Sequence, residues 1–416
     1  CPAAMAATLG AEAAAAFQRL MHEHNTAGVS ISALGGGTST GSRSGADLAL
    51  GLADREAGVP LRPETLLQAA SLSKTVAAAF ALEYFAERGV AMATPVNGLL
   101  KAAGADFRLE AAAACPAAWA DEVMLAHLVD HTGLGMHYVR GVPRSETMPS
   151  ALALVRGERR TDLGYERIEV AKRPGRVFGY SGGGFLVLQV LLEALERRSI
   201  EEIMRPFLDR CGMGDFTFAQ EDQSGAAYAA GYFDDGSRVP GGRLMFPALA
   251  AGGIGAPRAL ANFWRHMLTA YAGRHEAAVS RDTATQMLTA AEDKGSGDFM
   301  SARVGMGVFI ADAGPNRIAL HQAANEGFRG MYLVCFHGPD AGQGYVVCAN
   351  GDNQAAICIA RIVQHLLIES SWQGIDHDLL RGRQNFDFGG IKQEEIVNFA
   401  YKTLVFDAFV APGEAH

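Results

Sequence analysis

The sequence predicts a mixed α/β (α+β) fold, in which helices flank an antiparallel sheet and an all-helical domain is inserted. Two observations carry this prediction. Short apolar runs typical of strands lie near both chain ends, at about 29–53 and 304–349, whereas about 90–230 is mostly helical in pattern. Strands that are far apart in a sequence of this kind usually pair into one sheet covered by helices. We expect a discontinuous sheet domain (1–72 and 230–370), a helical domain (73–229) and a C-terminal extension (371–416).

The first elements follow from the apolar pattern. An Ala-rich segment at about 7–24 predicts a helix, and the alternating segment 29–34 predicts a strand that ends in Gly35–Gly37. A second short strand is expected at about 47–53. A long helix is expected over about 72–88, opened by Ser71 and closed by Gly89.

The pattern between about 90 and 230 is helical, with loop-like interruptions at 136–147 and 171–184. After about residue 300 it becomes that of short strands separated by turn signals, followed by a helix and, in the extension, an amphipathic helix. In this last helix Lys402 and Asp407 favour packing on the protein surface over crossing a membrane. The expected ranges are 304–311, 317–321, 330–336 and 344–349 for the strands, and 354–370 and 393–409 for the helices.

Composition and charge exclude several classes of protein. Of the 416 residues, 49% are hydrophobic and 19% are charged, which is not the composition of a disordered chain. The net charge is −9 and no Lys/Arg run exceeds two residues, so neither nucleic acid nor an anionic membrane is an expected partner. No apolar stretch reaches the about 18 residues of a transmembrane helix. The sequence is compatible with a homo-oligomer as well as a monomer.

The cysteines leave the cellular compartment undecided. Cys1 fits the lipid-modified first residue of a lipoprotein, a removed leader or a trimmed chain. None of the six cysteines lies in a C-x-x-C pair, so their spacing predicts neither a zinc site nor a disulfide framework. Cys335 and Cys348 lie in two apolar runs where a cross-strand disulfide is one alternative. Buried free thiols are the favoured one.

The strongest chemical signal is the S-x-x-K spacing of Ser71 and Lys74 at the start of the long helix. This spacing places the hydroxyl and the amine on one helix face, one turn apart. Serine is a weak nucleophile until a neighbouring base takes its proton, and a lysine serves as that base only if burial or nearby cations lower its pKa. The motif alone is weak, because any serine-rich helix start can produce it.

Further blocks in the same order make the pattern specific. Phe178–Phe185 contains Tyr180 before a glycine cluster, and Leu320–Phe328 contains His321. Together the blocks resemble the serine β-lactamase and penicillin-binding-protein superfamily. The likeness is to its class C-like branch of esterases, D-aminopeptidases and acyltransferases, and it covers roughly residues 15–370. It implies a β-lactamase/transpeptidase-like fold. The other matching blocks are 58–67, 125–134, 206–215, 251–254 and 350–352.

The resemblance implies a role for each matching residue. Ser71 corresponds to the acylated nucleophile and Lys74 to its proton partner. Tyr180 corresponds to the general base or acid that moves the proton to and from the leaving group. The backbone N–H groups of Ser71 and Ala324 correspond to the oxyanion hole.

The departures from the family pattern bear on the substrate. Gly182 stands where the second motif often has an asparagine, and the third motif, usually Lys/His-Thr/Ser-Gly, reads His321-Gln322-Ala323. These changes argue against β-lactams and cell-wall peptides and favour a neutral or bulky acyl substrate. We expect Gly182, His321, Gln322, Ala323 and Asn325 to contact the substrate, although a turn role for Asn325 is equally compatible with the sequence.

Metal and cofactor sites are not expected. His127, His131 and His137 form a histidine group, but only Asp130 is a carboxylate nearby and the resemblance makes His131 a buried structural residue. The glycine runs 35–37 and 182–184 are expected in turns, because no phosphate-loop pattern accompanies them.

The function predicted from these residues is a cofactor-free serine hydrolase that acts on esters through an acyl-enzyme. The first alternative is an acyltransferase with the same site, in which an alcohol or amine replaces water. A D-amino-acid amidase or peptidase comes next, and a non-catalytic binding protein of the same fold comes last. A small-molecule acyl substrate is the expected partner in each enzymatic case.

Overall fold

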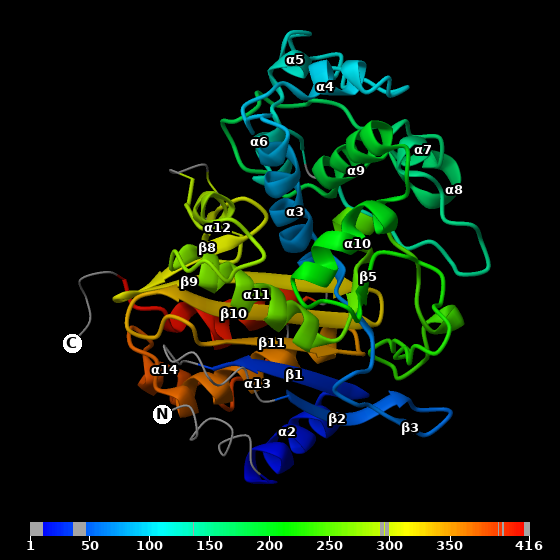
Figure 1. The fold of residues 1–416 in the computed structure, drawn as a ribbon. Helices are drawn as coiled ribbons and strands as arrows, with labels where there is room; N and C mark the ends of the chain where they lie inside the picture. Colours follow the sequence, from blue (N-terminus) through cyan, green and yellow to red (C-terminus); the bar gives the residue numbers. More distant parts are fainter. Residues whose placement is uncertain are drawn as a thin grey trace.

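A computed structural model describes residues 11–35, 47–135, 137–291, 295, 299–389, 391–392 and 395–411 (Figure 1). Its main element is an eight-stranded sheet with the order β3-β2-β1-β11-β10-β9-β8-β7, in which all neighbours are antiparallel. The predictions for Cys1, Gly36 and Gly37 lie outside the described residues. The strands are β1 (Gly28–Leu34), β2 (Asp47–Asp54), β3 (Val59–Pro60), β7 (Arg303–Val304), β8 (Phe309–Ala313), β9 (Asn316–Asn325), β10 (Phe328–His337) and β11 (Gly344–Ala349).

The sheet joins the two chain ends, which confirms the predicted fold class. β1 pairs with β2 on one side and with β11 on the other, so that Val29 lies opposite Ala349. A small three-stranded sheet, in the order β4-β6-β5, lies beside η1 (Ala70–Leu72). Its strands are β4 (Leu67–Gln68), β5 (Phe216–Thr217) and β6 (Ile254–Gly255).

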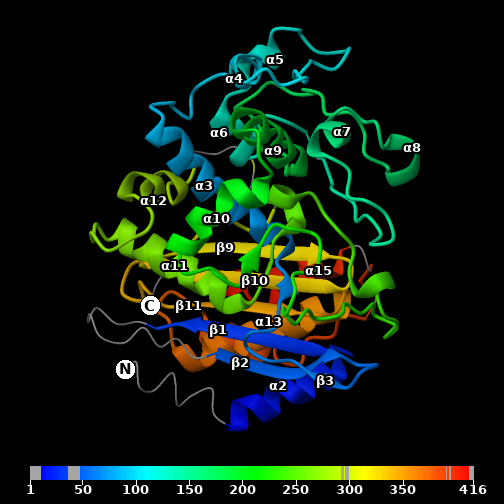
Figure 2. The same ribbon diagram turned by 45° about the vertical axis from the view of Figure 1, so that its right-hand side comes forward.

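Helices cover both faces of the main sheet, which explains why β10 and β11 are apolar on both sides. In β11, Val346 and Cys348 belong to the apolar core that includes α11 (Pro257–Tyr271), whereas Tyr345 and Val347 belong to the core of α13 (Asn353–Ser370). Figure 2 shows α11 on one face and α13 with α15 (Ile396–Leu404) on the other. The remaining helices of these layers are α2 (Ala11–Glu23), α12 (Arg281–Met287) and α14 (His377–Gly382).

Helix α3 (Ser73–Glu87) runs from the sheet into a group of other helices (Figures 1 and 2). Its first ten residues are buried all round, as expected for an Ala-rich helix with neighbours on every side. Thr75 bonds to Tyr332 of β10, with 2.8 Å between the two hydroxyl oxygens. α3 therefore contacts both the sheet and the group of helices. The division of the chain into 1–72 with 230–370, 73–229 and 371–416 remains a prediction. The other helices are α4 (Val96–Ala102), α5 (Trp119–Glu122), α6 (Leu125–Val129), α7 (Ala151–Val155), α8 (Arg160–Leu163), α9 (Gly182–Glu196) and α10 (Ile200–Arg210).

Two sequence-based expectations are wrong in detail. Gly182–Gly184 form the first turn of α9 instead of a loop. A Cβ on Gly184 would lie 2.4 Å from the carbonyl oxygen of Leu128. Glycine therefore lets α9 pack closely against α6. The amphipathic helix of the extension is also shorter than expected: α15 ends at Leu404, and a 3₁₀ turn over Phe406–Ala408 follows.

The five described cysteines are free thiols. Cys335 pairs across the sheet with Ile318 and Cys348 pairs with Gly330, so the two side chains are not cross-strand neighbours. Free thiols were the favoured alternative in the sequence. Within the described residues, no helix is both long and apolar enough to span a bilayer.

Candidate active site

Ser71 lies on a strained turn at the start of α3. It is the central residue of the 3₁₀ helix η1 (Ala70–Leu72), which leads directly into α3. Ala70 has a φ of +45°, a left-handed conformation that costs an alanine free energy and often marks functional sites. The first N–H groups of a helix have no acceptor within the helix, so the Ser71 N–H is available to a ligand.

Lys74 contacts Ser71 and is almost completely buried. Its Nζ donates to Ser71 Oγ over 3.1 Å and to the carbonyl oxygen of Ala250 over 2.6 Å. Lys74 is only 1% exposed, and this burial lowers the pKa of its amine from 10.5 to about 7. The S-x-x-K spacing therefore yields an amine that is about half neutral at pH 7 and in hydrogen-bond contact with a serine hydroxyl.

Tyr180 packs against the same lysine. Lys74 Nζ lies 4.8 Å from the centre of the Tyr180 ring. The ring is stacked between His131, at 4.6 Å between centroids, and Phe299, at 4.8 Å. Burial raises the pKa of Tyr180, and a hydrogen bond with the Ser71 side chain opposes part of that shift. The structure thus brings Ser71, Lys74 and Tyr180 together, and the phenol stays protonated.

His131 stacks on one face of the Tyr180 ring. The Ser181 backbone N–H donates to His131 Nδ1 over 3.1 Å, and the imidazole is buried. Burial, with the charge of Lys74, holds the pKa of His131 well below 6.5. His137 Nδ1 lies 3.1 Å from Ser181 Oγ, and His127 Nδ1 accepts from the Met124 N–H. Within the described residues, no three His, Cys, Asp or Glu side chains are grouped to hold a metal.

The last part of β9 has a free edge. Among the described residues, β8 pairs with β9 only as far as Leu320, whereas β10 pairs with it through Asn325. The turn between β9 and β10 has two residues, so we expect Asn325 and Phe328 to exchange backbone hydrogen bonds. In an antiparallel pair, the N–H and C=O groups of the next residue along the strand point to the opposite edge. The N–H of Ala324 therefore points away from β10. Because η1 packs against β9, this edge faces the Ser71 turn.

The other residues of the third motif lie on two different faces of β9. His321 is fully buried on the α3 side, and burial together with the charge of Lys74 lowers its pKa to about 3, so the imidazole is neutral. Ala323 is buried on the same side. Gln322 lies on the opposite face, where its side chain donates to Asn398 of α15. Only its main chain is therefore on the side of Ser71.

Asn325 is also occupied by the protein. Its Nδ2 donates to Gln68 Oε1 and to the carbonyl oxygen of Ala251, each over 3.1 Å, and the residue is 4% exposed. These bonds tie the end of β9 to the small sheet and to the π-helical turn η3 (Ala248–Gly252). Of the two sequence-based alternatives for Asn325, this geometry favours the turn role.

Gly182 lies where the family pattern often has an asparagine. A Cβ at this position would lie 2.8 Å from Cγ1 of Val139 and 3.0 Å from the carbonyl oxygen of His137. A larger side chain does not fit unless the 137–139 segment moves. The space beside Gly182 is therefore filled by Val139.

Two contacts of the site were missed in the sequence. Ala250 offers only a backbone carbonyl to Lys74, and Phe299 stacks on Tyr180 from a segment about 120 residues away in the chain. The glycines after Ala250 gave a weak signal for a special backbone at η3. The sequence around Phe299 gave none.

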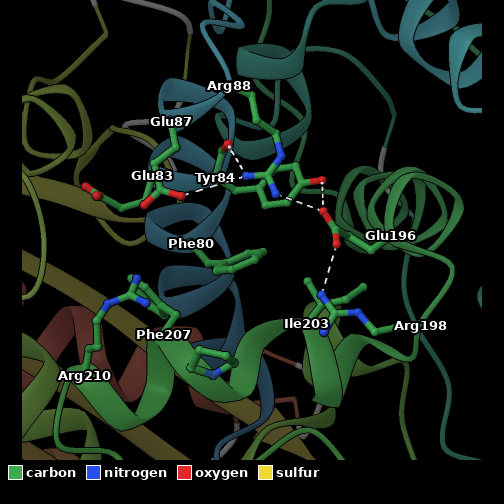
Figure 3. Close-up of a pocket in the computed structure, with 11 residues that line it drawn as sticks. Phe80, Glu83, Tyr84, Glu87, Arg88, Glu196, Arg198, Ile203, Phe207 and Arg210 are labelled. Atoms are coloured by element: carbon green, nitrogen blue, oxygen red, sulfur yellow. Dashed lines mark hydrogen bonds and ion pairs between the residues drawn. The ribbon is translucent and has the colours of Figure 1, made fainter.

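A surface pocket lies at the opposite end of α3 (Figure 3). Tyr84 Oη donates to Glu196 Oε1 over 2.6 Å, and Arg88 pairs with the same carboxylate at 2.9 Å. At 1.5 Å per residue these side chains lie on the order of 20 Å from Ser71. The paired charges join α3 to α9, and this pocket has no part in the site at Ser71.

The fold, with a serine and a buried lysine in contact at the start of the central helix, defines the class of β-lactamase-like serine hydrolases. A beta-lactamase family model matches residues 13–365. The chain therefore belongs to the beta-lactamase family. No curated protein sequence matches it significantly.

Solved structures show the same fold at low identity. An octameric penicillin-binding protein homologue from Pyrococcus abyssi is 18% identical, with a TM-score of 0.64 over 87% of this chain and 78% of that one. A class C beta-lactamase from Rhodobacter sphaeroides is 19% identical, with a TM-score of 0.62 over 86% and 100%. A D-amino acid amidase from Ochrobactrum anthropi SV3 is 16% identical, with a TM-score of 0.56 over 82% and 92%.

Proposed function

We propose that this protein is a carboxylesterase that cleaves uncharged esters through an acyl-enzyme on Ser71. The observation that carries the proposal is the contact of Ser71 Oγ with a fully buried Lys74 at 3.1 Å, with the pKa of the amine lowered to about 7. A neutral amine at this distance can take the serine proton near neutral pH.

The proposed acylation uses the contact between Lys74 and Ser71. Lys74 takes the Ser71 proton as Oγ attacks the ester carbonyl carbon, and the N–H groups of Ser71 and Ala324 stabilise the resulting oxyanion. Tyr180, protonated because it is buried, donates its proton to the departing alkoxide and regains one from the Lys74 ammonium. Water then attacks the acyl-enzyme, gives up its proton through the same pair, and releases the acid and Ser71.

The third motif supports an uncharged substrate. His321 is neutral, because its pKa is lowered to about 3, and the Gln322 side chain bonds to Asn398 on the far face of the sheet. Neither side chain offers a positive charge or a hydroxyl to a substrate carboxylate. A substrate with such a carboxylate would lose its solvation without gaining a partner, at a free-energy cost of about 1–3 kcal/mol for each unpaired polar group.

We therefore expect turnover of short-chain nitrophenyl esters and very weak turnover of nitrocefin, penicillin or D-Ala-D-Ala peptides. The measurement is kcat/KM for each substrate with one enzyme preparation. If nitrocefin matched or exceeded the best ester, the ester assignment would be wrong and the protein would be a β-lactamase. If an added alcohol or amine accelerated acyl release in a saturable way, acyl transfer would replace hydrolysis as the function.

The pKa of Lys74 predicts the pH dependence. The base must be neutral, so kcat/KM should rise about tenfold per pH unit below about 7 and level off above it. The unfolded chain has the ordinary lysine pKa and binds more protons at Lys74 between pH 7 and 10.5, so the contribution of Lys74 to the free energy of unfolding should rise with pH in this range. Four buried thiols, whose pKa values are raised from 9.0 to about 12, oppose this rise above about pH 9, so the net rise should be measured between pH 7 and 8.5.

Lys172 provides the control, because burial lowers its pKa to about 8 and its Nζ bonds to the Val177 carbonyl oxygen instead of Ser71. A Lys172→Met variant should keep the acidic limb of the pH–rate profile. If Lys172→Met lost the fall of kcat/KM below about pH 7, that fall would belong to Lys172, and our assignment of it to Lys74 would be wrong.

A further inference from the structure

The end of β9 that carries Ala324 is supported by a neighbouring strand on one edge only. Among the residues that the structure describes, β8 pairs with β9 as far as Leu320, and beyond it β10 alone continues to Asn325. A strand segment with one neighbour is held less firmly than one inside a sheet, because its outer backbone groups have no partner in the sheet. The direction of the Ala324 N–H therefore depends on what holds the β9–β10 turn.

Arg329 of β10 is the residue opposite Ala324. Because the pair next to the turn is hydrogen-bonded, these two residues form a non-hydrogen-bonded pair, whose side chains lie close together on one face of the sheet. Gln322, two residues before Ala324, is on the same face and contacts α15, on the side away from Ser71. Any effect of the Arg329 side chain on Ser71 must therefore pass through the backbone of the two strands.

The guanidinium of Arg329 folds back onto the β9–β10 turn. Its Nη1 donates to the carbonyl oxygen of Asn325 over 2.5 Å and to that of Phe328 over 2.9 Å. Its Nη2 donates to Asn353 Oδ1 over 2.7 Å and pairs with Asp352, at the start of α13. One planar cation thus joins both ends of the turn to a long helix on the far face of the sheet.

These contacts do more than attach β10 to α13. The side chain of Arg329 is only 8% exposed, and a buried charge is tolerated only when it is paired and hydrogen-bonded. The bonds to Asp352 and Asn353 already attach β10 to the helix. The two further bonds, to the turn carbonyls, restrain the residues that end β9.

We propose that Arg329 is a positioning residue of the active site: by restraining the β9–β10 turn, it keeps the Ala324 N–H directed at the oxyanion. This inference rests on the proposed function, in which that N–H stabilises the transition state. An oxyanion donor acts when charge develops on the carbonyl oxygen, so its displacement lowers kcat more than it raises KM. A residue that only stabilises the fold changes neither constant in the folded protein.

The test is kcat and KM for the best nitrophenyl ester, with the Ki of an alkyl trifluoromethyl ketone, whose adduct with Ser71 would carry an oxyanion. Arg329→Met should lower kcat at least tenfold and weaken the ketone by a similar factor, with KM within about threefold of the wild type. Arg329→Lys should recover only part of kcat. An ammonium can pair with Asp352, but it lacks the planar fork that reaches both turn carbonyls.

A second variant separates positioning from folding, because Arg329→Met leaves the Asp352 carboxylate buried without its partner. The double variant Arg329→Met/Asp352→Asn removes both charges and should be more stable than Arg329→Met alone. It should keep the low kcat, because the turn carbonyls still lack their donor. Recovery of kcat to within about twofold of the wild type would overturn the proposal, since the loss would then come from the unpaired carboxylate.

Arg361→Met is the matched control. Arg361 is a second buried arginine, and its Nη2 donates to the backbone carbonyl oxygen of Phe386 over 2.7 Å, in the C-terminal extension. Its replacement removes the same kind of bond away from β9, so kcat and the Ki of the ketone should stay within about twofold of the wild type. An equal loss of kcat in Arg361→Met and Arg329→Met would show a general effect of lost stability and contradict positioning by Arg329.

Hydrogen exchange of the segment 321–328 provides a readout that needs no ester. Its slowly exchanging amides should exchange at least tenfold faster in Arg329→Met/Asp352→Asn than in the wild type, and at the wild-type rate in Arg361→Met. Unchanged exchange in the double variant would overturn the role of Arg329 while the esterase function stands. If the wild type turned over no ester, the proposed function would fail, and the exchange rates would still decide whether Arg329 restrains the turn.

Discussion

Replacement of Ser71 by alanine should abolish ester turnover, with a loss of at least 10³-fold in kcat that reaches the limit of detection. Oγ is the atom that forms the acyl bond in the proposed reaction, and no other hydroxyl accepts the Lys74 hydrogen bond among the contacts of the described residues. The change removes one oxygen from a partly exposed side chain, so the fold should persist. A fluorophosphonate probe should label the wild type and leave Ser71→Ala unlabelled.

Ser73→Ala is the matched control, two residues along the same turn. Ser73 Oγ accepts from the Gly253 N–H over 2.8 Å and is fully buried, so its loss should lower the free energy of unfolding by about 1–3 kcal/mol. Labelling of Ser71 should survive in this variant. Labelling that disappears in Ser73→Ala and persists in Ser71→Ala would assign the nucleophile to the other serine.

Lys74→Met and Tyr180→Phe should each lower kcat/KM by at least 10²-fold, and the double variant should be within about tenfold of the worse single variant. In the proposed reaction the two residues pass one proton between them, so removal of either interrupts the same path. Tyr180→Phe keeps the ring that stacks on His131 and Phe299, and its effect should therefore come from the hydroxyl. The measurement is a double-mutant cycle on the best nitrophenyl ester.

Tyr84→Phe controls for loss of a buried phenol. It removes the bond to Glu196 at the far end of α3 and should leave kcat/KM within about twofold of the wild type. Losses from Lys74→Met and Tyr180→Phe that multiply in the double variant would show that the two residues act independently, against the shared proton path.

The order of strands and helices could be predicted because local patterns determine it. The apolar runs near both ends predicted β1, β10 and β11 nearly in place, and the Ala-rich run after Ser71 predicted α3. The single strand expected at 304–311 is wrong, because a turn at 305–308 divides it into β7 and β8, which pair with each other. The strand expected at 317–321 was too short, since β9 extends to Asn325. Its last residues still alternate between buried and more exposed, but Gln322 and Asn325 are polar, so the apolar run in the sequence stops at His321.

The candidate site was predictable only where spacing or family resemblance decides it. Ser71 and Lys74 are one helical turn apart, and Tyr180 lies in a motif. The orientation of Gln322 was not predictable, because it depends on which face of β9 meets α15. The filling of the space at Gly182 by Val139 was equally hidden, since it arises from a backbone contact between segments about 40 residues apart.

The pairing of β1 with β11 has a consequence for synthesis on the ribosome. The ribosome makes Ser71 early, but the strand that supplies the Ala324 N–H comes about 250 residues later, and β1 must wait for β11 to fill its second edge. Closing so long a loop is slow and leaves apolar strands exposed meanwhile. A nascent or prematurely terminated chain therefore carries the proposed nucleophile without the proposed second oxyanion donor, and the proposed esterase activity should arise only as the last strands are completed.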